Sequence, residues 1–537
     1  MKPLVALFFC CLAIHLPLAA QPFIDWQTIY GMPATDHSIN DIIANPDGSY
    51  MAIGEISGTQ TLTDYDLLLL KITATGDTLW SQAIGEANED KGYALVATND
   101  NAYVIAGTTN SITGMFANTH GLHDAWILKV ADTGEIIWSY TWGGSGEEQI
   151  FDITSDNSGN YYVAGYSEST DYEINNKGFT DGYILKINDV GELVWQQTYG
   201  GTSFDRLRAI TFDPSTQLLL AAGSTASIDF DLADTTPKGG NDVWVIKIDP
   251  STSALSSSYR YGGSLNDVAM AMTKTADGGV ALIGDSLSSD GDLTQNFGTD
   301  DWWIFKIDFM GSLQWQRSVG QQAYDNARTL VATPDGHLIA TGHTFDPDLP
   351  PPNYFFDIRV LKLRQDNGNI AWQGRYGGSQ YEFGNAVALS NNGNGIVVAG
   401  ATDSTDGDVG TNGGGMQHPN LPSGNVRHGS HRAWIFHLDE IMVNTPPINP
   451  NGMNSTVYPN PTNDKVTLNI SHNKPLNNAT ISIYNTNGQI IAQQLINTND
   501  YATTIELNTH HYPQGLYSVL VQLGDKTAYR HKIIIAQ

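Results

Sequence analysis

A unit of roughly 50–60 residues recurs along most of the chain and constrains the fold more than any other feature. The copy at residues 124–169 begins with an apolar run that ends in lysine, followed by a run that contains tryptophan and closes on Gly143-Gly144. An acid and two further apolar runs follow, and the second of these ends in Ala164-Gly165. The unit begins at the following acids: Asp66, Asp124, Asp181, Asp242, Asp301 and Asp357. A repeat of this size dictates the fold, because each copy buries its apolar surface against the next.

Fragments of the unit stand at both ends of the repeated region and complement each other. Residues 26–31 match the tryptophan run, and residues 433–438 match the lysine run that should precede it. Each unit holds four short runs rich in Ile, Val, Leu, Tyr and Trp, which predicts four strands. Six full units and one split unit, each taken as a blade, predict an all-β, seven-bladed β-propeller over residues 21–440, closed by its N-terminal strand. A right-handed β-solenoid is the alternative, but it gives no reason for complementary ends.

Other propellers suggest an order for the four strands of a blade. We expect the run after the acid (150–155) to be innermost, the Ala-Gly run (161–165) second, the lysine run third and the tryptophan run outermost. The loops after each Gly-Gly and after each Ala-Gly then share one face, which we call the loop face. A ligand is expected there.

The pattern W-x-x-x-[YW]-G-G-x-x-x-[DE], followed by G-x-Y-x-V-A-G, resembles β-propeller repeats of exported proteins of the Bacteroidetes type. The resemblance covers about residues 26–440 and implies a fold rather than a reaction. Some related proteins carry endoglucanase-like descriptions.

The first twenty residues are typical of a secretory signal peptide, with Lys2 before an uncharged apolar run and cleavage expected before Gln21. A lipoprotein interpretation of Cys10 or Cys11 is disfavoured, because the apolar run continues past both. These are the two cysteines of the chain, so the mature protein has no thiol for disulfides, metal binding or nucleophilic catalysis. No later stretch of the sequence is long and apolar enough to predict a transmembrane segment.

Acidic residues outnumber basic ones, with 56 Asp and Glu against 26 Lys and Arg and a net charge of −30. Nucleic acids and anionic membranes bind basic patches, so this balance argues against both as partners. The charge is compatible with binding cations, but solubility alone explains it as well.

An acid lies five residues after the first turn glycine of every unit. The seven acids are Asp36, Asp90, Glu148, Asp205, Asp267, Asp325 and Glu382. As a ring at the mouth of the channel they would bind a cation or an amine. Alternatively, each carboxylate accepts backbone N–H bonds within its own turn, and equal recurrence in every blade favours this structural role.

A lysine recurs in the third strand of six units, and His437 takes its place in the last. The lysines are Lys71, Lys129, Lys186, Lys247, Lys306 and Lys362. Strand alternation places Lys129 on the face opposite Trp126, where we expect it to pair with an acid. The acid at the head of the same strand, Asp124, is one candidate.

Two loops after Ala-Gly contain Asp-Gly-Asp, at Asp290 and Asp292 and at Asp406 and Asp408. Alternating carboxylates beside glycine could hold Ca²⁺ as a cofactor, although the full twelve-residue calcium loop is missing and a surface turn is the alternative.

The longest loop, residues 401–431, contains His418, His428 and His431, three side chains of a type that binds Zn²⁺. Its Gly-rich flanks argue against a fixed metal site. No catalytic set stands out elsewhere, because Asp is so common that any carboxylate pair can be imagined, and the Gly-Gly pairs open no helix.

Composition changes over residues 441–455, which are rich in Pro and Asn and predict a linker. Six or seven short alternating runs then predict a small Ig-like β-sandwich over residues 456–537. This region resembles the C-terminal sorting domain of type IX secretion cargo in Bacteroidetes. The residues that carry the resemblance include Tyr458, Pro459, Asn460, Pro461, Gly488, Gly515, Tyr517 and Lys532.

The resemblance implies the type IX secretion machinery as a partner, a secreted or cell-surface location, and removal of the domain after export. An adhesive sandwich that stays attached is the alternative. For the propeller, we expect binding of a glycan or a surface protein. A secreted polysaccharide hydrolase with its active site on the loop face, and a structural surface protein, are the alternatives. Function is expected where the units depart from one another, above all in residues 401–431.

Overall fold

The computed structural model consists of two compact units, Gln21–Ile441 and a second one that includes Met442–Gln537. In the first unit it describes residues 22, 24–31, 35–57, 65–116, 118–172, 174–322, 324–345, 355–391, 395–409 and 431–439. In the second it describes residues 454–458, 464–471, 479–484, 490–496, 498, 500, 502–513, 515–523 and 526–535. The signal peptide expected from the sequence lies outside the described residues, and so does the expected linker except for Asn454 and Ser455, which begin β29 (Asn454–Tyr458). Among the described residues, no helix has the length and apolar character needed to span a membrane.

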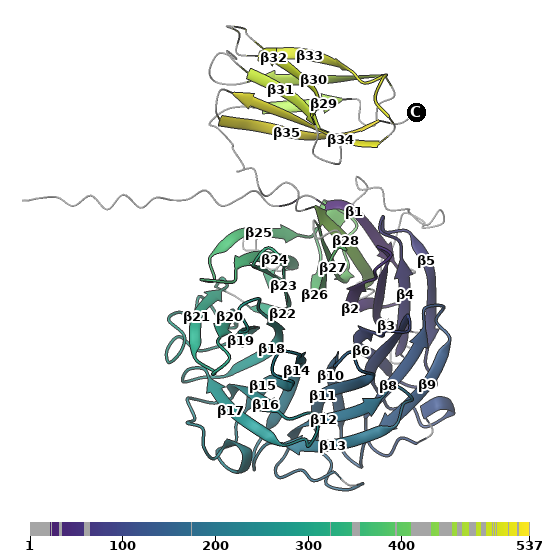
Figure 1. The fold of residues 1–537 in the computed structure, drawn as a ribbon, viewed down its shortest axis with the longest axis vertical. Helices are drawn as coiled ribbons and strands as arrows, with labels where there is room; N and C mark the ends of the chain where they lie inside the picture. The colour runs from purple at the N-terminus through teal and green to yellow at the C-terminus, as the bar shows by residue number, and fades with distance from the viewer. Residues whose placement is uncertain are drawn as a thin grey trace, which may run out of the picture. The chain divides into compact units, whose positions relative to one another are not determined.

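The first unit consists of seven four-stranded antiparallel sheets arranged around a central axis, as Figure 1 shows. The innermost strands are β2 (His37–Ala44), β6 (Asp90–Ala97), β10 (Glu148–Ser155), β14 (Asp205–Asp213), β18 (Asp267–Lys274), β22 (Asp325–Ala332) and β26 (Glu382–Leu389). The second strands are β3 (Tyr50–Ser57), β7 (Ala102–Thr109), β11 (Asn160–Ser167), β15 (Leu218–Thr225), β19 (Val280–Ser286), β23 (His337–Phe345) and β27 (Gly395–Thr402).

The third strands are β4 (Tyr65–Ile72), β8 (Asp124–Ala131), β12 (Asp181–Asn188), β16 (Asp242–Ile248), β20 (Asp301–Ile307), β24 (Phe356–Arg364) and β28 (Arg432–Asp439). The outermost strands are β5 (Thr78–Ile84), β9 (Ile136–Trp142), β13 (Leu193–Tyr199), β17 (Leu255–Tyr261), β21 (Leu313–Val319), β25 (Ile370–Tyr376) and β1 (Ile24–Tyr30). Three short 3₁₀ turns are also described, at Gly114–Phe116, Phe230–Leu232 and Gly407–Val409. The seven-bladed propeller and its strand order are therefore confirmed.

The N-terminal strand closes the ring. β1 pairs antiparallel with β28, with Gln27 opposite Phe436, and completes the sheet β1-β28-β27-β26. The indole N–H of Trp434 donates to Oε1 of Gln27 at 2.7 Å, which joins strands about 400 residues apart. The sequence unit, however, is not a blade: residues 124–169 span β8 and β9 of one blade and β10 and β11 of the next. Each unit therefore bridges two neighbouring sheets.

Apolar side chains on both faces of the inner strands pack between neighbouring blades. Ile127 of β8 and Ile150 and Val163 of the next blade belong to one fully buried cluster. The third strand is consequently buried along nearly its whole length, whereas the outermost strand alternates between half-buried and exposed positions. Each fully buried Val, Leu, Ile or Phe contributes roughly 1.5–3 kcal/mol. Packing between blades therefore holds the ring together.

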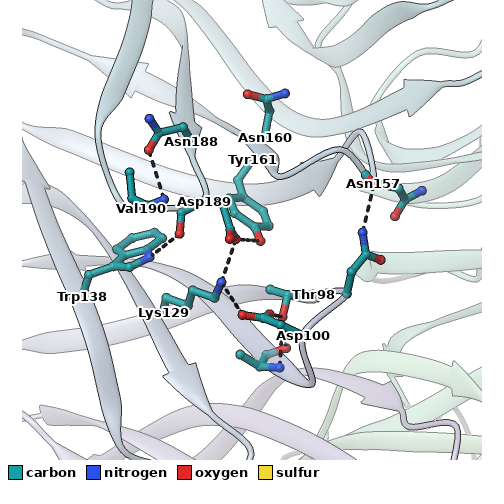
Figure 2. A network of polar contacts seen from close by, with 12 residues as sticks. Thr98, Asp100, Lys129, Trp138, Asn157, Asn160, Tyr161, Asn188, Asp189 and Val190 are labelled. Carbon is teal, nitrogen blue, oxygen red and sulfur yellow. Dashed lines mark hydrogen bonds and ion pairs between the residues drawn. The ribbon is translucent and has the colours of Figure 1, made fainter.

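A buried lysine fastens each of several blade pairs on the face opposite the loop face. Nζ of Lys129 lies 2.9 Å from Oδ2 of Asp100, in the turn that follows β6, and 2.7 Å from Oδ1 of Asp189, in the turn that follows β12 of the next blade (Figure 2). The hydroxyl of Tyr161 donates to the same oxygen of Asp189 at 2.8 Å. The lysine thus joins two turns that belong to different sheets.

The expected pairing of Lys129 with the acid at the head of its own strand is wrong. Oδ2 of Asp124 instead accepts the backbone N–H of His120 at 2.7 Å. The head and the lysine stand at opposite ends of β8, so their charged atoms do not meet. Turn-directed ion pairs recur as Lys71–Asp132, again between neighbouring blades, and as Lys306–Asp277 and Lys362–Asp335, each within one blade.

The C-terminal unit contains two sheets. One consists of β29 (Asn454–Tyr458), β30 (Lys465–Ser471) and β33 (Ala502–Asn508), and the other of β32 (Ile490–Ile496), β31 (Ala479–Tyr484), β34 (Gly515–Leu523) and β35 (Lys526–Ile535). Leu468 of the first sheet and Ile481 and Val519 of the second share one buried apolar cluster. The sequence predicts six or seven short strands here, and the Ig-like character of the domain stays a prediction.

Candidate functional site

Six of the recurring acids begin the innermost strands and are completely buried: Asp90, Glu148, Asp205, Asp267, Asp325 and Glu382. Oε2 of Glu148 accepts the backbone N–H of Gly144 at 2.7 Å, and Oε1 accepts the hydroxyls of Ser167 at 2.6 Å and Ser169 at 2.7 Å. Every such carboxylate accepts a backbone N–H from four residues earlier and a hydroxyl from the second strand. Burial raises the pKa of Glu382 to about 7. These carboxylates accept hydrogen bonds from the backbone of their own turns, which supports the structural role over ligand binding.

Asp36 does not occupy this position. The register pairs His37 with Ile56 where Glu148 pairs with Ser167, so His37 takes the place of the acid in the first blade. Oδ1 of Asp36 accepts the backbone N–H of His431 at 2.9 Å. Burial lowers the pKa of His37, which favours its neutral form. Counting from the turn glycine hides this difference, because the turn after Gly31 is one residue longer than the others.

The Asp-Gly-Asp loops direct their carboxylates at the preceding glycine turn. Oδ1 of Asp290 accepts the N–H of Ser264 at 2.7 Å, and Oδ2 of Asp292 accepts the N–H of Gly262 at 3.0 Å. These bonds connect the loop after β19 with the loop after β17 and confirm that both kinds of loop share one face.

The second Asp-Gly-Asp loop repeats this arrangement. Asp406 accepts the N–H of Ser379 at 2.8 Å, and Asp408 accepts the N–H of Gly377 at 3.2 Å. The described residues contain no group of three or more His, Cys, Asp and Glu side chains placed to hold a metal ion. The contacts support the turn alternative for both loops, and binding of Ca²⁺ stays a hypothesis.

Most of the long loop expected to carry function lies outside the described residues, including His418 and His428. Its last residue, His431, is described, and its Nδ1 lies 2.7 Å from Oδ1 of Asp403. The hydrogen bond to Asp403 raises the pKa of His431.

Each innermost strand carries a β-bulge, and the extra residue at the bulge differs from blade to blade. The seven bulge residues are Asn40, Tyr93, Phe151, Arg208, Met270, Arg328 and Asn385. A bulge leaves its extra residue outside the ladder and redirects its side chain, which is why bulges are common at functional sites. These positions, unlike the acids, distinguish the blades from one another.

The bulges also explain the glycine of the recurring Ala-Gly pair. Gly165 lies opposite the bulge of β10, and a Cβ atom there would lie 1.8 Å from the backbone oxygen of Gln149. The second strand must therefore present glycine wherever the innermost strand bulges toward it.

Several bulge side chains contact the neighbouring blade around the channel. Nδ2 of Asn385 donates to the carbonyl of Ile39 at 3.0 Å, and Nδ2 of Asn40 donates to the carbonyl of Gly92 at 2.9 Å. The rings of Tyr93 and Phe151 are 6.4 Å apart, and the guanidinium of Arg208 lies 4.5 Å above the ring of Phe151. We call the seven bulge side chains the bulge ring.

A cavity of about 160 Å³ opens beside the bulge ring in the fourth blade. Its lining residues are Phe204, Arg206, Arg208, Ser224, Asn241 and Val268. Phe204 stacks on Phe179 with ring centroids 5.0 Å apart, and both rings are largely exposed. An exposed aromatic pair therefore stands next to a cationic cavity on the loop face.

A second group of aromatic rings lies on the loop face of the last two blades. Tyr381 stacks on Phe383 at 6.2 Å and meets Phe355 edge-on at 4.9 Å. Tyr324 is 51% exposed. At the matching position in the second blade stands Glu89, which pairs with Lys91 and His123 at 3.5 Å each. The residue before the recurring acid is thus aromatic in the last two blades and acidic in the second.

The comparisons with known proteins concern the C-terminal unit. Residues 456–536 match the family model described as a secretion system C-terminal sorting domain. This region is a type IX secretion sorting domain. The chain is therefore a secreted or cell-surface protein that the type IX machinery recognises through this domain.

The structure places some of the predicted sorting residues. Tyr458 lies in β29, Gly515 and Tyr517 in β34 and Lys532 in β35, and the Tyr517 side chain is buried. Pro459, Asn460, Pro461 and Gly488 lie outside the described residues.

The chain as a whole has no match among the curated proteins. The Neurospora crassa Pan2 WD40 domain resembles the structure with 12% identity and a TM-score of 0.43, covering 79% of this chain and 98% of that chain. Sqt1 from Chaetomium thermophilum has 10% identity and a TM-score of 0.40, covering 71% and 97%. A Synechocystis apocarotenoid oxygenase has 12% identity and a TM-score of 0.35, covering 63% and 71%.

Proposed function

We propose that the propeller is an extracellular glycan-binding module whose ligand contacts the loop face of the fourth blade. The exposed, stacked rings of Phe179 and Phe204 beside the cavity carry this proposal. Exposing two large apolar rings to water is unfavourable. A sugar ring can cover both of them with its C–H groups. Export through the sorting domain supports this role, because a secreted or cell-surface protein meets extracellular glycans.

The rim carboxylates favour binding over hydrolysis. A glycosidase needs two carboxyl groups facing each other across the scissile bond, about 5–9.5 Å apart. Glu89 is instead held in ion pairs with Lys91 and His123, and Glu147 accepts hydrogen bonds from Gln149 and Tyr166. These acids are engaged in the wall of the channel, which supports a binding role.

The experiment measures binding of the full chain lacking residues 1–20 to a glycan array, together with hydrolysis of every glycan that binds. We expect Phe204→Ala and Phe179→Ala each to weaken binding about tenfold, because each removes one aromatic contact of roughly 1 kcal/mol or more. Phe309→Ala is the matched control, since this half-exposed ring lies in the turn after β20, on the opposite face.

Three results would overturn the proposal. One is binding to no glycan on the array. Another is equal binding by Phe204→Ala and the parent protein. The third is turnover of the bound glycan, which would replace the binding role by that of a hydrolase.

A further inference from the structure

Three arginines of the channel lack the partners that other arginines of the propeller have. Arg206 and Arg208 stand on β14 and Arg328 on β22, and none of them forms a hydrogen bond or ion pair with any described residue. The remaining arginines of the described propeller residues all donate hydrogen bonds: Arg260, Arg317, Arg359, Arg364, Arg375 and Arg432. The contrast is sharp in a chain with a net charge of −30, where acids are abundant.

The fold positions these arginines with aromatic support. Arg208 and Arg328 are the bulge residues of their strands, and Met270 of the intervening strand β18 stands between them in blade order. The guanidinium of Arg206 lies 4.5 Å above the ring of Tyr166, as that of Arg208 does above Phe151. Stacking fixes the plane of a guanidinium and leaves its N–H edge available to a ligand.

Like charges gather here with incomplete compensation. Burial, together with the charges of Arg206 and Arg328, lowers the pKa of Arg208 to about 10. The carboxylate of Asp285 counteracts this lowering of the Arg208 pKa. Burial, however, raises the pKa of Asp285 itself to about 6, and its Oδ1 accepts the backbone N–H of Ala327 at 2.7 Å. Glu168 also acts on Arg206, so two carboxylates only partly compensate the three cations of this site.

The cavity beside Arg206 and Arg208 has about 160 Å³, the volume of roughly five water molecules. This space is large enough for one acidic group of a glycan but not for the polymer itself. A planar guanidinium matches the oxygens of a carboxylate or a sulfate ester in a bidentate manner. The exposed rings of Phe179 and Phe204 adjoin the same cavity and would hold the neighbouring sugar.

We propose that Arg206, Arg208 and Arg328 bind the carboxylate or sulfate group of an acidic glycan. This inference rests on the proposed glycan-binding function and specifies its ligand. The rings would contact the sugar, and the arginines would select its charge.

The test is isothermal titration calorimetry of the full chain lacking residues 1–20. The probes are a polyuronate, a sulfated dextran, unmodified dextran and inorganic sulfate. We expect at least one acidic polymer to bind at least tenfold more tightly than dextran, with affinity falling as salt increases. Arg208→Gln and Arg328→Gln should each lose tenfold or more on the acidic polymer, and Arg208→Lys should lose less than Arg208→Gln. Arg364→Gln is the control, because this exposed arginine pairs with Asp366 outside the channel.

The arms distinguish the possible failures. Dextran binding as tight as that of the acidic polymers, or unchanged binding in both glutamine variants, would overturn the acidic specificity and leave the glycan-binding function standing. Absence of binding to both acidic polymers would overturn this inference, whereas the glycan-binding function falls only if no glycan on the array binds. Binding of inorganic sulfate alone would show an anion site unrelated to glycans and would also overturn the inference. Thermal unfolding of each variant verifies that lost binding is not lost folding.

Discussion

Nζ of Lys129 lies 2.7 Å from Oδ1 of Asp189, and the two residues belong to neighbouring blades. The lysine side chain is 3% exposed, so the carboxylates of Asp189 and Asp100 take the place of water around its charge. The pair shows how the propeller joins separate sheets on the face away from the channel mouth.

Replacing this lysine should therefore weaken the ring. We expect Lys129→Met to lower the free energy of unfolding by about 1–3 kcal/mol, because two carboxylates lose their shared cation and only partly regain water. Lys186→Met is the matched control, since Nζ of Lys186 donates to the carbonyl of Pro250 rather than to an acid. Denaturant unfolding measures both variants. An equal or smaller loss in Lys129→Met would contradict the role of the ion pair.

Because β10 bulges toward Gly165, we expect a substitution there to lower the free energy of unfolding more than Lys129→Met does. A Cβ atom at this position would meet the backbone oxygen of Gln149 at 1.8 Å, so Gly165→Ala must displace one of the two strands. We expect a loss of about 3 kcal/mol or more. Ala164→Gly serves as the control and should cost roughly 1–2 kcal/mol, because it removes one buried methyl group and adds chain entropy without a clash. A tolerated Gly165→Ala would show that the bulge is not required.

Buried acids predict a pH dependence of stability. Burial raises the pKa of Asp152 to about 7, and its oxygens accept the N–H groups of Ile153 at 2.8 Å and Ile210 of the next blade at 2.7 Å. An acid whose folded pKa exceeds its unfolded pKa holds its proton more tightly when folded. Its contribution is complete below about pH 4 and disappears as the pH rises through about 7.

The free energy of unfolding should therefore increase when the pH falls from 7.5 to 5.5. The increase should be smaller in Asp152→Asn, which cannot titrate. Acids with a lowered pKa, such as Asp277 at about 2, act only below this window, because both their folded and unfolded forms stay ionised in it. Equal pH dependence in Asp152→Asn and the parent protein would contradict the assignment.

The sorting domain predicts a dependence of export on residues 456–536. Deleting these residues should leave the propeller inside the producing cell, because the type IX machinery would have no domain to recognise. Fractionation after pulse labelling measures this directly. Unchanged release of the truncated chain would contradict the sorting role, and deleting only the segment 441–453, which ends before β29, is the control that should preserve export.

The architecture can be predicted from the sequence because the repeat is visible in every copy. The complementary fragments at residues 26–31 and 433–438 predict closure of the ring, and the pairing of β1 with β28 confirms it. The prediction from spacing is wrong at Asp36. The turn before β2 is one residue longer than the others, so His37 rather than Asp36 takes the position of the recurring acid. A distance along the chain does not report register when a turn changes length.

The candidate site cannot be predicted in the same way. Strict alternation along β14 puts Arg208 on the same face as Arg206, but it does not show that Arg208 stands at a bulge, after which the alternation shifts by one residue. The signal in the sequence is indirect: glycine recurs in the second strand, as at Gly165, because the strand opposite bulges. The contact of Arg208 with Phe151 also joins different units, and a single sequence read along its length does not reveal it.

Hydrogen–deuterium exchange of the full chain, with and without the glycan that binds most tightly, tests the central claim most directly. The claim is that the ligand occupies the loop-face end of the channel at the fourth blade. It predicts slower exchange on binding in residues 200–209 and 222–226, with the outermost strands β9 and β13 unchanged. Protection confined to the outermost strands or to the C-terminal unit would contradict it.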